Sequence, residues 1–147
     1  MNNRKTAGSF QLIFTFGIII FAALFVCSLT IDVLMHIWLQ WTSGFIAALI
    51  VYFFVYGGYY YFEIDKVDDH FEVRFYNSFP FGRDFKMFRV PITAFIKYEI
   101  NGNKFYRKKL LLYQMSSSQL AKYPPIYITA FSSKDLNDLK KFFASIK

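Results

Sequence analysis

The sequence has little of what catalysis or metal binding requires. It contains one cysteine and two histidines among 147 residues, and no Gly-rich phosphate loop followed by lysine. The single cysteine, Cys27, excludes a disulfide within one chain, and no cysteine and histidine spacing matches a zinc site. Asp68 and Asp69 are adjacent acids in an expected turn, where carboxylates are usually just solvated. We therefore predict no enzymatic activity, no catalytic residues, no metal and no cofactor.

Charge is missing from two long stretches of the first 62 residues. Residues 10–30 and 41–62 contain no Asp, Glu, Lys or Arg, although the whole chain has 17 basic and 10 acidic residues. A helix of about 20 residues spans the roughly 30 Å hydrocarbon core of a bilayer, where the backbone must bond to itself. We predict two transmembrane helices that form a hairpin over residues 10–62, preceded by a short segment at residues 1–9.

Two other interpretations of the first stretch fit less well. Arg4 and Lys5 precede it, as in a signal peptide, but the apolar run exceeds the usual ~7–15 residues and no A-x-A cleavage site follows. Lipoprotein processing at Cys27 is disfavoured by the bulky Phe25 and Val26 before it. We expect the stretch to be retained as a helix.

The basic residues predict an orientation. Arg4 and Lys5 precede the first stretch, no Lys or Arg lies between the two stretches, and all the others follow the second. By the positive-inside rule, both termini face the cytoplasm. We therefore expect a multi-pass protein of the bacterial inner (cytoplasmic) membrane, with residues 63–147 as a cytoplasmic domain.

The residues after the second stretch alternate with the period of two that is typical of half-buried antiparallel strands. Phe71, Val73 and Phe75, for example, share one face of a strand. The predicted strands cover residues 58–65, 70–77, 84–90, 92–100, 104–115 and 126–131. Turns are predicted at Lys66–Asp69, at Pro80–Gly82 and, as a tight hairpin, at Asn101-Gly102, with a polar loop over Ser116–Pro125.

The end of the chain changes to helical spacing. Ser132 or Ser133 can cap a helix, and an apolar stripe follows it. The stripe consists of Leu136, Leu139, Phe143 and Ile146. We expect it to cover an open end of the sheet. The alternative is a helix that lies on the membrane with its apolar face down.

Six or seven antiparallel strands followed by one amphipathic helix resemble a pleckstrin-homology-like (PH-like) barrel. Arg89–Ile96 (RVPITAFI) is similar to the "I-P-x-x-x-I" stretch that opens a middle strand in that family, and Ile126–Thr129 before the helix is similar to its close. With the helical hairpin in front, the chain resembles small bacterial membrane proteins that carry a bacterial PH-like domain. This implies a mainly β, α+β barrel. It implies no phosphoinositide site, because the loop Asp65–Asp69 has three acids and one lysine.

The segment 104–109 (KFYRKK) combines four cations with two aromatic residues. A cation close to an anionic membrane surface gains about 1 kcal/mol. The candidate contacts for anionic lipid are Lys104, Arg107, Lys108 and Lys109. A solvated strand end that discourages edge pairing explains the same residues. Nucleic acid fits poorly, because membrane attachment restricts access and no RNA-binding motif is present.

The helical hairpin itself suggests a partner. Small residues such as Gly17 and Gly44 permit close helix approach, and many Phe side chains remain for lipid or for another protein. We therefore predict a non-enzymatic, membrane-anchored interaction module, such as an accessory or scaffold subunit of an inner-membrane complex. The alternative is an anionic-lipid-sensing module at the cytoplasmic membrane surface. The expected partners are membrane lipids and other membrane protein subunits, with no nucleic acid.

Overall fold

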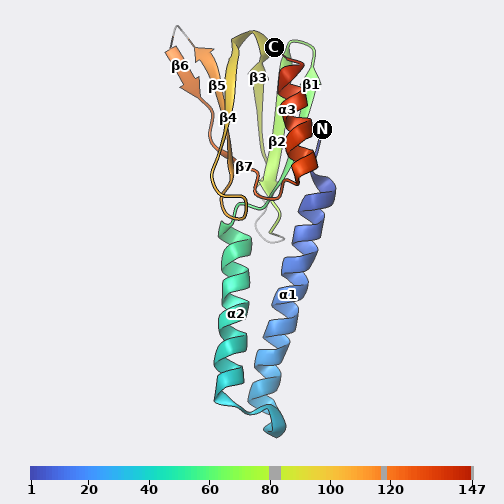
Figure 1. Cartoon of the computed structure of the whole chain (residues 1–147), viewed down its shortest axis with the longest axis vertical. Coiled ribbons are helices and arrows are strands. Elements are labelled where there is room, and N and C mark those ends of the chain that lie inside the picture. Colours follow the sequence, from blue (N-terminus) through green and yellow to red (C-terminus); the bar gives the residue numbers. More distant parts are fainter. Residues whose placement is uncertain (80–83, 117–118, 147) are drawn as a thin grey trace.

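The computed structural model describes residues 1–79, 84–116 and 119–146. Two long helices lie side by side and carry a β-rich domain at one end (Figure 1). They are α1 (Arg4–Thr30) and α2 (Ile37–Tyr56), joined through a short 3-10 helix at Asp32–Leu34. Both are long and apolar enough to cross a membrane, as the sequence predicts. Each begins earlier than expected, at Arg4 instead of residue 10 and at Ile37 instead of residue 41.

Glycines bring α1 and α2 close together. A Cβ atom at Gly17 would lie 3.3 Å from Ile50 Cδ1, and one at Gly44 would lie 3.3 Å from the Phe25 ring. Larger side chains at either position would have to displace these neighbours. The close helix approach expected from small residues is therefore found at both glycines.

α2 ends at Tyr56, before the expected residue 62. Gly58 adopts a φ of +80°, a left-handed conformation that a residue with a Cβ atom resists. Thr129 secures this bend, because its hydroxyl donates to the Gly57 carbonyl (2.9 Å) and its N–H donates to the Gly58 carbonyl (3.3 Å). The chain therefore leaves the helix and enters the first strand within a few residues.

Seven strands of the described chain form two antiparallel sheets. The first sheet has the order β1 (Tyr60–Val67), β2 (His70–Asn77), β3 (Lys86–Pro91). The second has the order β4 (Phe95–Asn101), β5 (Lys109–Ser116), β6 (Gln119–Lys122), and β7 (Ile126–Tyr127) also pairs with β5. The mainly β, α+β fold predicted from the sequence is therefore confirmed.

Across the described residues the two sheets do not close into a barrel, so this part of the prediction is wrong. β3 ends at Pro91, which has no N–H to donate, and a 3-10 turn at Ile92–Ala94 redirects the chain before β4. β7, which follows β6 in the chain and pairs with β5, is only two residues long. Beyond it, Thr129 bonds to the end of α2 instead of to a strand.

Several strand boundaries also differ from the prediction. β2 and the turn at Lys66–Asp69 are as expected, with Val67 paired to His70. The strand expected over 104–115 begins only at Lys109, and the one expected over 126–131 ends at Tyr127. The loop expected at Ser116–Pro125 contains β6, and the turn at Pro80–Gly82 lies outside the described residues.

The core lies between the two sheets and α3 (Ser133–Ala144). Ser132 caps α3, because its hydroxyl accepts from the Asp135 N–H while the Asp135 carboxylate accepts from the Ser132 N–H. Leu139 and Phe143 are buried, and the Phe143 ring stacks on Tyr98 at 4.4 Å between centroids. The apolar stripe of α3 therefore covers the sheets, as predicted, instead of lying on a membrane.

The first residues of the chain extend the first sheet along the edge of β1. Met1 and Ile64 exchange two backbone hydrogen bonds, of 2.9 and 2.8 Å, and Asn2 bridges to Glu63. α1 starts directly after this pairing, and the Thr6 hydroxyl donates to the Asp135 carboxylate at the start of α3 (2.7 Å). The domain is thus attached to both long helices.

Candidate functional site

The segment between β4 and β5, residues 102–108, is here called the junction loop. It lies at the end of the domain that meets α2 (Figure 1). The Arg107 N–H donates to the Gly57 carbonyl (2.8 Å), and the Tyr59 hydroxyl donates to the Phe105 carbonyl (2.9 Å). Gly102 and Arg107 both have positive φ, +105° and 51°, which ends β4 and replaces the expected two-residue turn with this longer loop.

The four cations predicted to contact lipid lie in or beside the junction loop. Arg107 and Lys109 converge on one ring: the Arg107 guanidinium donates to the Tyr127 hydroxyl (2.9 Å), and Lys109 Nζ lies 5.7 Å from the centroid of that ring. Lys104 Nζ lies 5.7 Å from the centroid of the Phe105 ring, and Phe105 is 72% exposed. Lys104, Arg107 and Lys108 lie in the junction loop instead of on the expected strand, and Lys109 begins β5. Their contact with lipid stays a prediction.

The cations of the junction loop affect one another's pKa. Burial lowers the pKa of Lys108, and the positive charges of Lys104 and Lys140 lower it further. The hydrogen bond to Tyr127 raises the pKa of Arg107, so its charge is retained. The positive charges of Lys104 and Lys140 therefore act on Lys108 at the same place as the charge of the neighbouring Arg107.

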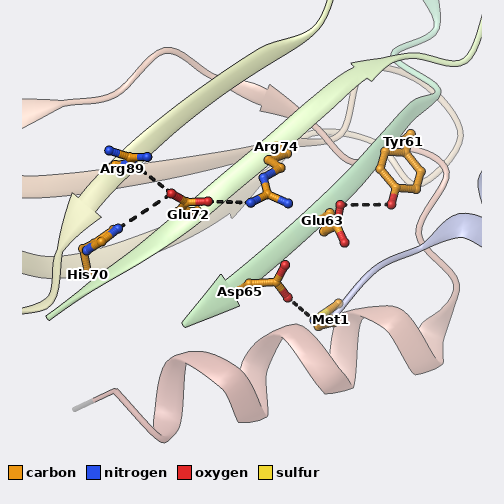
Figure 2. A network of polar contacts seen from close by, with 8 residues as sticks. All are labelled: Met1, Tyr61, Glu63, Asp65, His70, Glu72, Arg74 and Arg89. Carbon is orange, nitrogen blue, oxygen red and sulfur yellow. Dashed lines mark hydrogen bonds and ion pairs between the residues drawn. The ribbon is translucent and has the colours of Figure 1, made fainter. Parts of the chain in front are cut away.

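A second polar cluster lies on the outer face of the first sheet. Figure 2 shows His70, Arg74 and Arg89 converging on Glu72. Arg74 Nη2 lies 2.6 Å from Glu72 Oε2, Arg89 Nε lies 2.8 Å from Oε1, and His70 Nε2 lies 3.8 Å from Oε1. The hydrogen bonds from Arg74 and Arg89 lower the pKa of the Glu72 carboxyl.

This cluster is structural in character. Both oxygens of Glu72 accept from guanidinium groups, so the carboxylate is not available as a general base. The sequence pattern places Glu72 and Arg74 on one face but misses Arg89, because that contact depends on the pairing of β2 with β3, where Glu72 lies opposite Arg89. Among the described residues, no group of three or more His, Cys, Asp and Glu side chains could hold a metal ion.

An aromatic row continues the same outer face toward α1. Tyr61 stacks on Tyr76 with 4.8 Å between ring centroids, and Tyr76 contacts Phe85 at 4.7 Å. Phe85 is 71% exposed and Met87 is 54% exposed beside a hollow of about 230 Å³. The predictions from the sequence do not include this surface. The signal for it is the alternation of the exposed residues 87 and 89 along β3, with the exposed Phe85 just before the strand.

Comparisons of the chain with protein-family models, with curated protein sequences and with solved structures give no match. The order of elements, two helices followed by antiparallel strands and a C-terminal helix, is present. The function of the chain is therefore inferred from its own geometry.

Proposed function

We propose that the chain is a non-enzymatic, membrane-anchored interaction module, such as an accessory or scaffold subunit of a protein complex in a bacterial inner membrane. The observation that best supports this is the outer face of the first sheet, where Phe85 and Met87 stand exposed beside Tyr76 and Arg74. Aromatic, Met and Arg side chains are enriched in protein interfaces and in their energetic hot spots.

Substitutions on this face test the proposal. Full-length protein carrying Phe85→Glu and Met87→Glu should lose the membrane subunits that copurify with the wild type from native membranes in mild detergent. Leu120→Glu is the control, because Leu120 on β6 of the other sheet is as exposed as Met87, 54% in each case. A wild-type chain that stays solitary, or a double variant that retains the same subunits, would contradict the proposal.

The proposal includes a topology with two membrane crossings and both termini in the cytoplasm. It can be tested with single cysteines in a Cys27→Ser background. Met35→Cys, between the two helices, should react with an impermeant maleimide added to intact cells. Lys134→Cys, exposed on α3, should react only after permeabilisation. The opposite labelling pattern would overturn the orientation.

A second function, contact with anionic lipid, is favoured by the junction loop. Its hydrogen bond to Gly57 holds Lys104, Arg107 and Lys108 beside the last turn of α2, with Lys109 at the start of β5. In nanodiscs, anionic lipid should slow hydrogen exchange over residues 102–109, and added salt should reverse the effect. Lys104→Gln combined with Lys109→Gln should weaken the response. Exchange that is indifferent to lipid charge and to salt would exclude this function.

A further inference from the structure

Tyr106 of the junction loop reaches along the side of α2. Its hydroxyl lies 3.2 Å from the Tyr52 hydroxyl, and its ring contacts the edge of the Phe53 ring at 5.9 Å between centroids. α2 ends at Tyr56, and a helix rises about 1.5 Å per residue, so Tyr52 lies about 6 Å before that end. The side chain of Tyr106 is therefore beside the last turns of α2 and not beyond the helix.

Contacts between the two long helices show that these turns belong to their uncharged stretches. Phe14 of α1 stacks on Phe54 of α2 with 4.7 Å between ring centroids. Phe14 comes four residues after Phe10, where the uncharged stretch of α1 begins, and is thus about 6 Å inside it. Tyr106 contacts the residue directly before Phe54. It is therefore level with uncharged residues of both helices.

Phe105, the residue before Tyr106, is 72% exposed. A single exposed Phe is ordinary on a protein surface. This one continues a larger aromatic surface, because Tyr52, Phe53 and Tyr56 of α2 are exposed as well. Tyr106 connects the two parts through its contacts with Tyr52 and Phe53.

Hydrogen bonds on both sides of Tyr106 fix the loop at this height. The Tyr59 hydroxyl donates to the Phe105 carbonyl (2.9 Å), and the Arg107 N–H donates to the Gly57 carbonyl (2.8 Å). Tyr59 and Gly57 both belong to the short segment that follows α2. The Phe105 ring therefore cannot withdraw from the end of α2 unless these bonds break.

Basic residues flank the two aromatic residues, with Lys104 before them and Arg107 and Lys108 after them. Aromatic rings are favoured at the interface between membrane and water. Long basic side chains can lay their apolar stems along such a surface and keep the charged ends in the headgroup layer. A bilayer is the partner that this position favours, because a protein that covered Phe105 would itself have to lie at the membrane surface.

We propose that the junction loop inserts Phe105 and Tyr106 into the interfacial layer of the bilayer, with Lys104, Arg107 and Lys108 among the headgroups. Interfacial elements bury their apolar side by roughly 5–10 Å, which agrees with the position of Tyr106 beside α2. The inference rests on the proposed crossing of the membrane by α1 and α2. It adds an apolar contact that needs no anionic lipid, so it holds or fails separately from the proposed contact of the cations with anionic lipid.

Tryptophan fluorescence of the full chain in bilayers of neutral phosphatidylcholine tests this proposal. The chain has two tryptophans, so Trp38→Phe with Trp41→Phe gives a background in which one new tryptophan reports its own depth. Phe105→Trp should be quenched by phosphatidylcholine that is brominated near the headgroup end of its acyl chains. Met115→Trp is the control, because Met115 is also exposed but lies six residues along β5 from Lys109, about 20 Å from the loop. Quenching of Phe105→Trp that is no stronger than that of Met115→Trp would overturn the insertion.

A third tryptophan separates this result from a failure of the membrane crossing. Phe45 is 65% exposed in the middle of α2. In the same background, Phe45→Trp should be quenched by lipid that is brominated toward the ends of its acyl chains. Quenching at Phe45 without quenching at Phe105 would overturn the insertion and leave the crossing in place. Absence of quenching at both positions would overturn both.

Salt and lipid charge separate apolar insertion from attraction of the cations. Quenching of Phe105→Trp in phosphatidylcholine should persist in high salt, because burial of an aromatic ring involves no screened charge. Quenching that appears only when phosphatidylglycerol is added, and that salt reverses, would overturn the insertion and support the contact with anionic lipid alone.

Discussion

Asn3 and Phe62 exchange two hydrogen bonds, as two paired strand residues do, but one of the acceptors is the Asn3 side chain. The Phe62 N–H donates to Asn3 Oδ1 (2.8 Å), and the Asn3 N–H donates to the Phe62 carbonyl (3.1 Å). Asn3 Nδ2 also donates to the Tyr60 carbonyl (3.0 Å), and Asn3 is 1% exposed. One asparagine therefore completes the edge of β1 at the point where α1 begins.

Replacing this side chain should destabilise the domain. Asn3→Leu would leave the buried Phe62 N–H without an acceptor, which typically costs about 1–3 kcal/mol. Thermal unfolding of the full chain in detergent should show a lower melting temperature than the wild type. Lys5→Ala, two residues away and exposed, should melt close to the wild type. Equal melting temperatures for all three proteins would show that the edge pairing adds nothing to stability.

Phe143 should be among the most sensitive positions in the domain. Its ring is buried in the core and stacks on Tyr98 and Phe95. Truncating a buried Phe typically costs about 3–5 kcal/mol of the ~5–15 available to a small domain. Phe143→Ala should therefore unfold the domain or greatly lower its melting temperature, whereas Lys141→Ala on the exposed face of α3 should change it little. A small effect at Phe143 would be inconsistent with its place in the core.

Two glycines should respond in opposite ways to the same substitution. Gly102 has a φ of +105°, and a Cβ atom there would lie 2.7 Å from the Arg107 carbonyl oxygen. Gly102→Ala should lower the free energy of unfolding by more than about 1 kcal/mol, because both the backbone and the contact are strained. Gly8→Ala is the matched control: it meets no neighbour and should stabilise α1 by up to about 1 kcal/mol. Denaturant or thermal unfolding of both variants shows whether the free energy of unfolding falls for Gly102→Ala and rises for Gly8→Ala.

The stability of the domain should depend on pH because of Glu72. Hydrogen bonds from Arg74 and Arg89 lower the pKa of its carboxyl from the ordinary 4.5. A carboxyl with a lowered pKa in the folded state contributes fully above its unfolded-state pKa, and this contribution is lost as pH falls through the folded-state pKa. The melting temperature of the wild type should therefore exceed that of Glu72→Gln at about pH 7, and the gap should narrow below about pH 4.5. A gap that persists unchanged at about pH 3 would show that ionisation of Glu72 does not matter.

The parts of the fold that the sequence predicted are those with a strong local pattern. Absence of charge marks α1 and α2, alternation marks β2, and the Ser132 cap with Leu139 and Phe143 marks α3. β6 was missed because an edge strand needs no buried face: Leu120 is exposed, so Gln119–Lys122 shows no alternation. The chain from Ile128 is buried but not a strand, because Thr129 bonds to the end of α2, a partner far away in sequence.

The candidate sites, too, were predicted where they depend on a local pattern and missed where they depend on distant residues. The cations of the junction loop were visible as a cluster in the sequence, but the positive φ of Arg107 and the hydrogen bond from its N–H to the Gly57 carbonyl were not. The contact between Glu72 and Arg89 depends on the register of β2 against β3. Such sites are set by long-range pairing, which the alternation of single strands does not encode.

The two attachments of β1 have a mechanical consequence. The chain of α2 runs into this strand through Gly57 and Gly58, while the strand's outer edge is hydrogen-bonded to the residues that begin α1. A force that parts the two helices would therefore act as shear along β1, pulling one side of the strand with each helix. The bonds of Asn3 to Phe62 and Tyr60 would bear that load first, because they are the contacts of this edge nearest to α1. Separation of the two helices would therefore strain a single strand of the domain.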